Sequence, residues 1–280
     1  KKKINLNYKG VINNIQYINE EIENEESFLS ILRANKQFYS IICETKEYIY
    51  AAVDHLRMYP LFYGVKGNNA YLSDSAKWIK EHLNVNKINN LVKAEFIMTG
   101  YVTGNDTLYQ DVKQLQAGEY LIYNKKKKTL RIKSHYHYMP RESNNDNKEK
   151  LINVLDEIHV KIFKRLIEFL DGRTAVLPLS AGYDSRVIAM MLKRLGYENV
   201  ICYTYGKTGN WESTISEQIA HELNYKWIFI PYTKSAWKNW INSQETKEYF
   251  ALSSQYTSLP HIQDHLAVGE LKRRELIPVD

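Results

Sequence analysis

Short apolar segments alternate with clusters of turn-forming residues along the first half of the chain. Two of these turns contain Gly-Asn-Asn at 67–69 and Gly-Asn-Asp at 104–106, compositions typical of loops between strands. Amphipathic stretches at 26–35 and 75–82 predict two helices. Five segments have the composition of β-strands: 38–43, 48–54, 70–74, 119–124 and 129–138. This order predicts an α+β domain built on antiparallel sheets.

After Leu151 the pattern changes to longer amphipathic stretches separated by apolar runs. Apolar residues recur every three or four positions over 151–170, which predicts a helix that ends at Asp171-Gly172. Predicted strands and helices then alternate: strand 174–179, helix 186–196, strand 200–206, helix 212–224 and strand 226–232. Strands that alternate with crossover helices form parallel sheets, so we expect an α/β domain with a doubly wound parallel sheet. Its ligands should bind beyond the carboxyl ends of the strands.

A linker is predicted between these two regions. Residues 140–150 carry no large apolar side chain and many turn formers. We therefore expect two domains, 1–143 and 144–280. Residues 277–279 have the composition of the start of a further strand, so the second sheet is expected to be truncated in this chain.

Composition excludes several classes of protein. The 280 residues are 44% hydrophobic and 25% charged, which excludes a wholly disordered, collagen-like or coiled-coil chain. No apolar stretch approaches the roughly 18 residues of a membrane span, so no membrane partner is expected. Cys43 and Cys202 each lie in an apolar run, which indicates reduced thiols in strands. The start KKKINLNY shows no signal peptide, and the expected location is the cytoplasm.

The net charge of +6 belongs to the first half of the chain. Residues 1–150 hold 23 basic and 17 acidic side chains, whereas 151–280 hold 15 of each. Two lysine runs, 1–3 and 125–128, supply seven of the positive charges. The second run lies between two predicted strands, which predicts a solvated hairpin tip. Because the charge is not dispersed as in a nucleic-acid footprint, no nucleic-acid partner is expected.

The segment 178–186, Pro-Leu-Ser-Ala-Gly-Tyr-Asp-Ser-Arg, joins a predicted strand to the following helix. Small residues at 180–182 allow phosphate oxygens to approach backbone N–H groups and the helix N-terminus. The hydroxyls of Ser180 and Ser185 can donate to the same anion. Asp184 would repel that anion, so its expected partner is a Mg²⁺ ion that bridges the phosphates. The alternative is an ordinary turn in which Asp184 and Ser185 cap the helix.

Residues 180–186, SAGYDSR, resemble the pyrophosphate-binding loop S-G-G-x-D-S of the N-type ATP pyrophosphatases, with Ala181 at the second glycine. In that family the loop grips the pyrophosphate of ATP while a substrate carboxylate attacks the α-phosphorus to form an acyl-adenylate. Residues 203–206 are similar to the strand end whose backbone contacts adenine, although a plain strand end is the alternative. The resemblance implies ATP and Mg²⁺ as cofactors, with Asp184 as metal ligand. It implies these nucleotide-binding residues: Pro178, Leu179, Ser180, Gly182, Asp184, Ser185, Tyr205 and Gly206.

The first half narrows this resemblance. Residues 51–65 and 70–79 resemble the asparagine synthetase signatures R-D-x-x-G-x-x-P-L-Y-Y and S-E-x-K-A-L, and 99–123 resemble the final stretch of the same domain. The matching positions are Asp54, Pro60, Leu61, Phe62, Tyr63, Gly118 and Tyr120. The resemblance covers approximately 38–232. It implies an asparagine synthetase-like protein, with an Ntn-hydrolase-like class II glutamine amidotransferase domain before an ATP pyrophosphatase domain.

Several family features are missing from the sequence. Glutamine-dependent members use an initial cysteine as nucleophile, whereas this chain starts with Lys1, lacks N-G-E-I-Y-N and has Val53 before Asp54. Cys43 is internal to an apolar strand, where burial raises a thiol pKa. We therefore expect a degenerate domain without glutaminase activity, or a chain that has lost its start. The second loop S-G-x-G-x-D-E is also absent, so the ATP pyrophosphatase domain is expected to be incomplete and to bind ATP and metal weakly.

Other candidate residues have weaker support. His135 and His137 would share one face of a strand, but no Cys or Glu accompanies them, which disfavours a metal site. Arg186 could pair with a phosphate or a substrate carboxylate, or face solvent. A helix predicted after Pro260 would begin near the sheet. Its candidate substrate-pocket residues are Ser258, His261, Gln263 and Asp264.

The leading hypothesis is an ATP-dependent, amide-forming ligase of the asparagine synthetase type. Its partners would be a small-molecule carboxylate and an amine or ammonia, and the sequence does not indicate an oligomeric state. One alternative is a non-catalytic nucleotide-binding or scaffold homologue. The other is a tRNA-modifying enzyme with the same loop, which the zero net charge of 151–280 disfavours.

Overall fold

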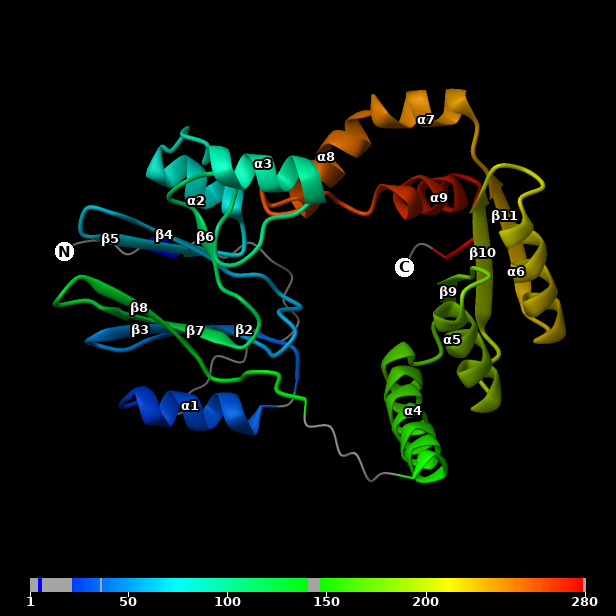
Figure 1. The fold of residues 1–280 in the computed structure, drawn as a ribbon, viewed down its shortest axis with the longest axis horizontal. Coiled ribbons are helices and arrows are strands. Elements are labelled where there is room, and N and C mark those ends of the chain that lie inside the picture. The colour runs from blue at the N-terminus through cyan, green and yellow to red at the C-terminus, as the bar shows by residue number, and fades with distance from the viewer. Residues whose placement is uncertain (1–4, 7–21, 36, 141–146, 279–280) are drawn as a thin grey trace. The chain divides into compact units, whose positions relative to one another are not determined.

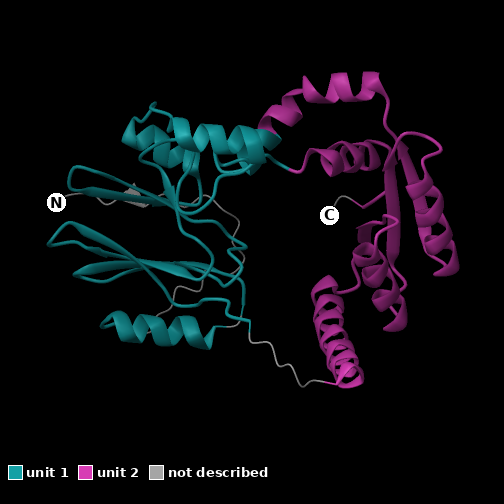
Figure 2. Cartoon of the chain, viewed as in Figure 1, with its two compact units in different colours: residues 1–140, 249–260 teal, residues 141–248, 261–280 magenta. Residues whose placement is uncertain are grey.

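The computed structural model describes residues 5–6, 22–35, 37–140 and 147–278. The lysine run 1–3 and much of the predicted linker lie outside these residues. The chain divides into two compact units, shown in Figure 2. Unit 1 comprises 1–140 and 249–260, and unit 2 comprises 141–248 and 261–280. The sequence places one boundary at 143/144, whereas in the structure a segment from beyond that boundary belongs to unit 1.

Two four-stranded sheets form the centre of unit 1, as Figure 1 shows. The first contains β2 (Ser40–Glu44), β3 (Tyr48–Val53), β7 (Glu119–Asn124) and β8 (Thr129–Ser134). Its order is β2-β3-β7-β8, with every neighbour antiparallel. The second contains β1 (Asn5–Leu6), β4 (Phe62–Lys66), β5 (Asn69–Ser73) and β6 (Lys113–Gln114). Its order is β1-β5-β4-β6, with β1 parallel to β5.

Alternate residues of β3 point to two different cores. Ile49, Ala51 and Val53 are fully buried in the core between the two sheets. Tyr50 and Ala52 face the other way, toward the helix α1 (Glu25–Ala34). The helix α2 (Ala76–Leu83) covers the outer face of the second sheet in the same manner. Unit 1 therefore has four layers, helix, sheet, sheet and helix, because each sheet buries both of its faces.

The antiparallel α+β architecture predicted from the sequence is confirmed. The sequence did not predict β4, because its first three residues are all buried and show no alternation of period two. It also missed β6 and the helix α3 (Asn90–Thr99). The lysines at 125–128 form the turn between β7 and β8, as predicted. The strand expected to extend to 138 ends at Ser134, so the prediction that His135 and His137 share a strand face is wrong.

Residues 254–258 attach to unit 1 by backbone and side-chain contacts. The side chain of Gln255 accepts a hydrogen bond of 2.8 Å from the backbone of Ala76, at the start of α2. The carbonyl of Thr257 accepts one of 2.7 Å from Val102. Tyr256 packs edge-on against Tyr109, with ring centroids 4.8 Å apart. The chain thus returns to unit 1 after the strands of unit 2.

Unit 2 is built on a parallel sheet, as predicted. Its strands are β9 (Ala175–Pro178), β10 (Val200–Gly206) and β11 (Lys226–Pro231), in the order β11-β10-β9. The helices α4 (Lys148–Leu170), α5 (Tyr183–Arg194) and α6 (Trp211–Glu222) follow the predicted alternation. Three further helices follow β11: α7 (Lys234–Ile241), α8 (Gln244–Ser253) and α9 (Ile262–Arg273).

Helices cover both faces of this parallel sheet. On one face, Leu177 and Cys202 pack with Phe163 of α4 and with residues of α5 and α6. On the other face, Tyr203 and Ile230 pack against α9. Ile277 joins this second core and is not part of a strand, while Val279 lies outside the described residues. Within the part of the chain that the structure describes, no helix is long and apolar enough to cross a membrane.

Candidate nucleotide-binding site

The loop after β9 leads directly into the first turn of α5. Gly182 is the N-cap residue and makes no side-chain capping hydrogen bond, so Tyr183, Asp184 and Ser185 belong to the helix. The alternative in which Asp184 and Ser185 cap the helix is therefore wrong. Because no side chain caps this end, backbone N–H groups of the first turn are available to an anion.

The two serines of the loop hold its backbone together. The Oγ atoms of Ser180 and Ser185 lie 3.0 Å apart, within hydrogen-bonding distance. Ser185 Oγ also accepts a 3.1 Å hydrogen bond from the backbone N–H of Ser180. Ser180 Oγ accepts one of the same length from Gly182. A Cβ atom on Gly182 would lie 3.2 Å from Ser180 Oγ, so a larger residue would crowd this contact.

Asp184 has an exposed side chain in the first turn of α5. No group of three or more His, Cys, Asp or Glu side chains that could hold a metal ion occurs among the described residues. Mg²⁺ commonly binds proteins through one or two carboxylates and completes its shell with substrate phosphates and water. A single exposed carboxylate in the first turn of α5 fits that mode.

Arg186 lies half-buried behind the loop. Its Nη2 donates a 3.1 Å hydrogen bond to the carbonyl of Ala181, and its guanidinium carbon lies 5.2 Å from the centroid of the Tyr183 ring. Its Nε is buried and has no hydrogen-bond partner in the part of the chain that the structure describes. Arg186 therefore does not simply face solvent: it holds the loop carbonyl and adds a positive charge beside the helix N-terminus.

The end of β10 lies next to the end of β9. Pro178 pairs with Tyr203, and the N–H of Leu179 donates 2.8 Å to the carbonyl of Tyr203. Pro178 is exposed and Leu179 is buried. Tyr205 and Gly206, the last residues of β10, are half-buried at the same edge of the sheet. The structure thus gathers the eight predicted nucleotide-binding residues at one edge, across two neighbouring strand ends and one helix start.

Gly206 has a backbone conformation that other residues rarely adopt, with φ of +130°. A Cβ atom at this position would lie 3.3 Å from the side-chain nitrogen of Asn210. Asn210 in turn caps α6 by accepting a 2.8 Å hydrogen bond from the backbone of Ser213. Two helices, α5 and α6, therefore begin at the carboxyl ends of adjacent parallel strands, an arrangement that favours anions.

A buried polar network that the sequence reasoning missed lies beneath the loop. Thr204 Oγ1 donates 2.6 Å to the carbonyl of Leu179 and lies 2.7 Å from Ser216 Oγ. The indole N–H of Trp227 donates to the same Thr204 oxygen over 3.2 Å. Threonine within an otherwise apolar and aromatic strand is the signal that could have indicated this network.

Tyrosines on the opposite face of the sheet surround the start of α9. The Tyr203 hydroxyl donates a 3.3 Å hydrogen bond to Asp264, whose other oxygen lies 2.7 Å from Nδ1 of His261. Tyr205 stacks on Tyr232, with ring centroids 5.0 Å apart. Burial, followed by the charge of Asp264, raises the pKa of Tyr205 to about 12. The hydroxyls of Tyr203 and Tyr205 therefore stay protonated at neutral pH and act as donors to Asp264.

The predicted substrate-pocket residues are divided between the two units. His261, Gln263 and Asp264 belong to unit 2, where the carbonyl of Gln263 accepts a hydrogen bond from the Tyr232 hydroxyl. Ser258 belongs to unit 1, where it pairs with Tyr101 in an isolated β-bridge. The three residues of unit 2 lie at the start of α9, the helix that packs on the parallel sheet.

In unit 1 the residues that carry the resemblance have structural roles. Asp54 is 3% exposed, and its carboxylate accepts backbone hydrogen bonds of 3.1, 2.8 and 3.2 Å from Tyr39, Leu56 and Met58. The N–H of Gly118 donates 3.0 Å to the Asp54 carbonyl. The remaining positions are Pro60, which is half-buried, and the buried residues Leu61, Phe62, Tyr63 and Tyr120.

Both cysteines are free thiols. Burial raises the pKa of Cys43 to about 11 and that of Cys202 to about 12. His135 follows β8, in the sheet that contains Cys43, but its ring is engaged elsewhere. Its Nε2 lies 3.0 Å from the carbonyl oxygen of Val53, and burial lowers the pKa of the imidazole. Neither thiol is thus placed or charged as a nucleophile at neutral pH.

Comparisons with known proteins give two findings. Residues 30–137 match the family described as "Glutamine amidotransferase domain". One similar solved structure is the NH3-dependent NAD synthetase from Campylobacter jejuni in complex with the nitrate ion, at 20% sequence identity and a TM-score of 0.24. That match covers 43% of this chain and 47% of the synthetase chain, so it spans about half of that protein. No curated protein sequence matches the chain significantly.

Proposed function

We propose that this protein is an ATP-dependent ligase of the asparagine synthetase type, which activates a carboxylate as an acyl-adenylate. The observation that supports this most is the geometry of the β9–α5 loop. Its two serine hydroxyls, one before α5 and one in the first turn of that helix, lie 3.0 Å apart at a helix N-terminus that no side chain caps among the described residues. Such an arrangement suits the pyrophosphate portion of ATP.

Different residues at this edge of the sheet would contact different parts of the nucleotide. Ser180, Gly182 and Ser185 would bind phosphate oxygens, and Asp184 would hold the Mg²⁺ that neutralises them. Pro178 and Leu179, with the backbone of Tyr205 and Gly206, would lie along the adenine. Arg186 would add charge beside the phosphates, because its guanidinium lies at the start of the same helix.

The reaction would proceed in two steps. An oxygen of the substrate carboxylate attacks the α-phosphorus of ATP, and the bond from that phosphorus to the bridging oxygen breaks, releasing pyrophosphate. An amine or ammonia then attacks the acyl carbon, AMP leaves, and the nitrogen loses a proton. The loop N–H groups and the helix dipole stabilise the negative charge that develops on the departing pyrophosphate.

The nitrogen donor would bind near the start of α9, at the carboxyl edge of the parallel sheet. Asp264 is a carboxylate that a tyrosine hydroxyl and a histidine already orient, and its side chain remains 31% exposed. A carboxylate so placed suits the ammonium form of an amine before that amine is deprotonated. We therefore propose Asp264 as the residue that receives the donor, whether ammonia or a larger amine.

Unit 1 would be an Ntn-hydrolase-like domain related to glutamine amidotransferases. The match over 30–137 and the four-layer arrangement of helices and sheets support this. Cys43 is half-buried and Cys202 is buried, and burial raises the pKa of both thiols, so we expect no glutaminase activity from either. Two free thiols also support the cytoplasm as the location.

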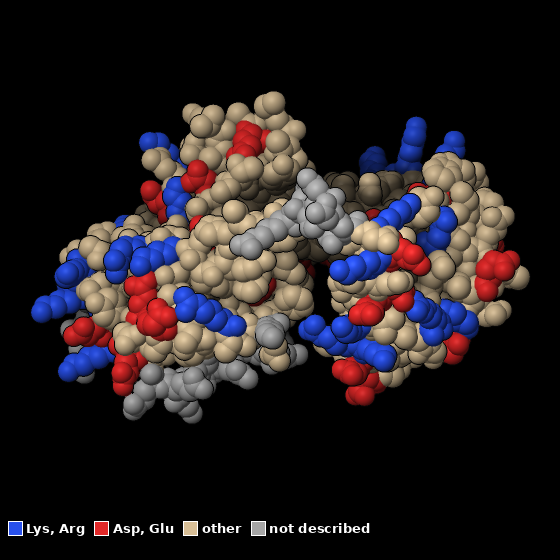
Figure 3. All heavy atoms as spheres, turned by 60° about the horizontal axis from the view of Figure 1, so that its bottom comes forward, with Lys and Arg blue, Asp and Glu red and all other residues tan. Residues whose placement is uncertain are grey.

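On the face drawn in Figure 3, basic and acidic side chains are interspersed within each unit, in keeping with small-molecule rather than nucleic-acid partners.

Exchange of pyrophosphate into ATP tests this function. With Mg²⁺ and a panel of carboxylates, the protein should catalyse exchange, and Asp184→Asn should lower the rate by about 100-fold or more. Asp171→Asn is the matched control, because Asp171 is an exposed residue in a left-handed conformation that Asn accepts. Exchange that survives Asp184→Asn would refute the assignment of this loop.

A non-catalytic nucleotide-binding homologue is the second candidate. It is favoured by the way Ser180 and Ser185 bond to each other and to the loop backbone. Calorimetry that shows ATP binding, together with no exchange for any carboxylate, would support it. Salt-sensitive binding of tRNA would instead support a tRNA-modifying enzyme.

A further inference from the structure

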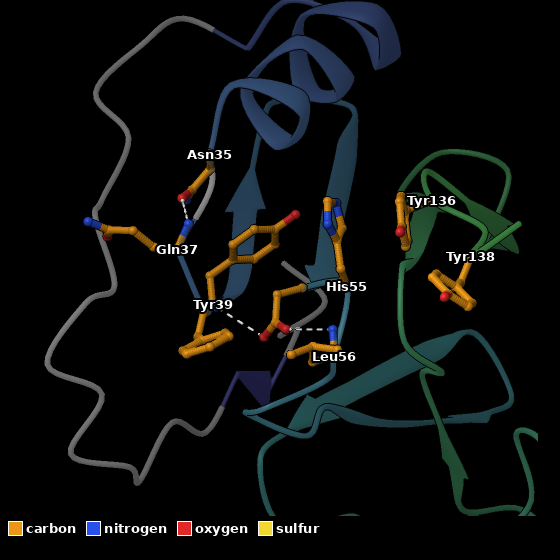
Figure 4. A pocket seen from close by; sticks show the side chains of 9 residues that line it. Asn35, Gln37, Tyr39, His55, Leu56, Tyr136 and Tyr138 are labelled. Carbon is orange, nitrogen blue, oxygen red and sulfur yellow. Dashed lines mark hydrogen bonds between the residues drawn. The ribbon is translucent and has the colours of Figure 1, made fainter. Parts of the chain in front are cut away.

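A cavity of about 350 Å³ opens in unit 1. Figure 4 shows the side chains that line it. They come from three places: the segment before β2, the residues that follow β3, and the residues that follow β8. This volume lies at the lower end of the range that small-ligand pockets occupy.

The wall of this cavity is largely aromatic. Phe38, Tyr39, Tyr136 and Tyr138 contribute rings. His55 stacks on Tyr136, with ring centroids 4.0 Å apart and planes inclined by 14°. Flat rings of this kind form favourable contacts with another flat, apolar group. The shape and chemistry of the wall therefore suit a planar ligand.

One polar group of the wall lacks a partner. Tyr39 is 2% exposed, and its hydroxyl forms no hydrogen bond with any described residue. In Figure 4 this hydroxyl points toward His55, another residue of the wall. Burial and the nearby charge of Asp54 raise the pKa of Tyr39 well above its usual value, so the hydroxyl keeps its proton at neutral pH. A buried donor without a partner is costly, and a ligand with an acceptor would remove that cost.

The charge of the wall further limits the kinds of ligand that can bind in the cavity. Asp54 is buried, and three backbone N–H groups hold its carboxylate. These contacts satisfy the carboxylate and fix the wall, but they leave a negative charge close to the cavity. An anionic ligand would be repelled by that charge.

We propose that this cavity binds a small neutral molecule in which a hydrogen-bond acceptor is attached to an aromatic ring, as in an aryl amide. The ring would lie against Tyr136 and Phe38, and its carbonyl oxygen would accept the Tyr39 hydroxyl. This site stands on unit 1 alone and does not depend on the ligase activity proposed for unit 2.

Benzamide is the probe, titrated into the 280-residue chain while backbone and aromatic NMR signals are followed. We expect shifts confined to the lining residues and a dissociation constant of roughly a millimolar, as is usual for so small a molecule. Toluene, which lacks the acceptor, and benzoate, which carries a negative charge, are the comparison probes. Benzoate should bind at least about fivefold more weakly than benzamide.

Tyr39→Phe removes the hydroxyl and keeps the ring. It should weaken benzamide binding about threefold to tenfold and leave toluene binding unchanged. Tyr123→Phe is the matched control, because Tyr123 is also buried in unit 1 but its hydroxyl already donates 2.9 Å to the carbonyl of Asn68. That variant should bind both probes as the parent does.

Three results would overturn the proposal. They are benzamide shifts absent up to about 10 mM, equal benzamide binding by the parent and Tyr39→Phe, and benzoate binding as tight as benzamide binding. Urea unfolding of both variants confirms that they are folded. Tyr39→Phe should unfold at the same or a higher urea concentration than the parent, since it removes a buried hydroxyl that has no partner.

Discussion

The hydroxyl of Thr204 donates a 2.6 Å hydrogen bond to the carbonyl of Leu179, the residue at which β9 passes into the candidate phosphate loop. The bond joins two neighbouring parallel strands through a side chain that is 6% exposed. Trp227 on β11 donates to the same threonine, so all three strands contribute to one polar cluster beneath the loop. The position of the loop thus depends on a residue 25 positions away in sequence.

Thr204→Val should destabilise the protein by about 1–3 kcal/mol, because it removes the hydrogen bonds of Thr204 to the buried Leu179 carbonyl and to the half-buried Trp227 indole. Urea unfolding, followed by circular dichroism, measures the free energy of unfolding. Thr208→Val, in the exposed turn after β10, is the control and should change stability by less than about 0.5 kcal/mol. Equal effects of the two substitutions would show that the network contributes nothing.

Gly206→Ala should cost about 1–3 kcal/mol of folding free energy, since alanine rarely adopts a φ of +130° and its Cβ would crowd Asn210. Gly209→Ala, at φ of +77° with no atom within 4 Å of the added carbon, tests strain without crowding. Its cost should be smaller, about 1 kcal/mol. Thermal unfolding of the two variants ranks them, and the reverse order would contradict this account of Gly206.

Glu25 links the helix α1 to two neighbouring strands, β7 and β8. Its carboxylate accepts hydrogen bonds of 2.6 Å from Lys133 and 2.7 Å from the Tyr120 hydroxyl. The Lys133 hydrogen bond is the main reason that the pKa of Glu25 lies below its ordinary value of 4.5. A lowered pKa in the folded state stabilises the protein above pH 4.5, and this contribution is lost as the pH falls through the folded value.

Glu25→Gln should therefore lower stability by about 0.5–1 kcal/mol at neutral pH and by nothing at about pH 2. Urea unfolding across this pH range measures the difference. The control is Glu26→Gln in the same helical turn, because the ion pair of Glu26 with Arg33 is exposed on both sides. That variant should show little effect at any pH, and a cost for Glu25→Gln that persisted in acid would contradict the assignment.

The thiols provide a test that needs no substitution. With pKa values of about 11 and 12, the thiolate fraction of Cys43 and Cys202 at pH 8 is roughly one in a thousand or less. A disulfide reagent should label the native protein far more slowly than the unfolded protein. Cys43, which is half-buried, should react before the fully buried Cys202. Fast labelling of Cys202 in the native state would show that the β10 core opens readily.

Much of the fold follows from local pattern. The alternation of apolar and polar residues placed β3, β7 and the three parallel strands correctly, because period two and period 3.6 are properties of neighbouring residues. The helix start at Tyr183 came three residues earlier than predicted, since Gly182, rather than Asp184 or Ser185, is the N-cap. β4 was missed because burial on both sides removes the alternation on which the prediction depends.

The candidate site was only partly accessible to sequence reasoning. Small residues and hydroxyls between a strand and a helix indicated the loop at 180–185, and the structure places it at a sheet edge with Tyr205 and Gly206. The support from Thr204 and Trp227 was not visible, because neither lies near the loop in sequence. Likewise, nothing in the pattern separates Ser258, which joins unit 1, from His261, which joins unit 2.

By itself, then, the sequence determined the antiparallel character of the first region, the alternation of strands and helices in the second, the strand-to-helix loop with its serines, and the lysine hairpin tip. The tertiary structure decided which distant groups meet: Thr204 with Leu179, Tyr203 with Asp264, and the segment 249–260 with the first unit. It also left the Tyr39 hydroxyl buried without a partner among the described residues. The physical reason is that periodicity records which face of an element is buried, whereas hydrogen-bond partners depend on how elements far apart in the chain pack together.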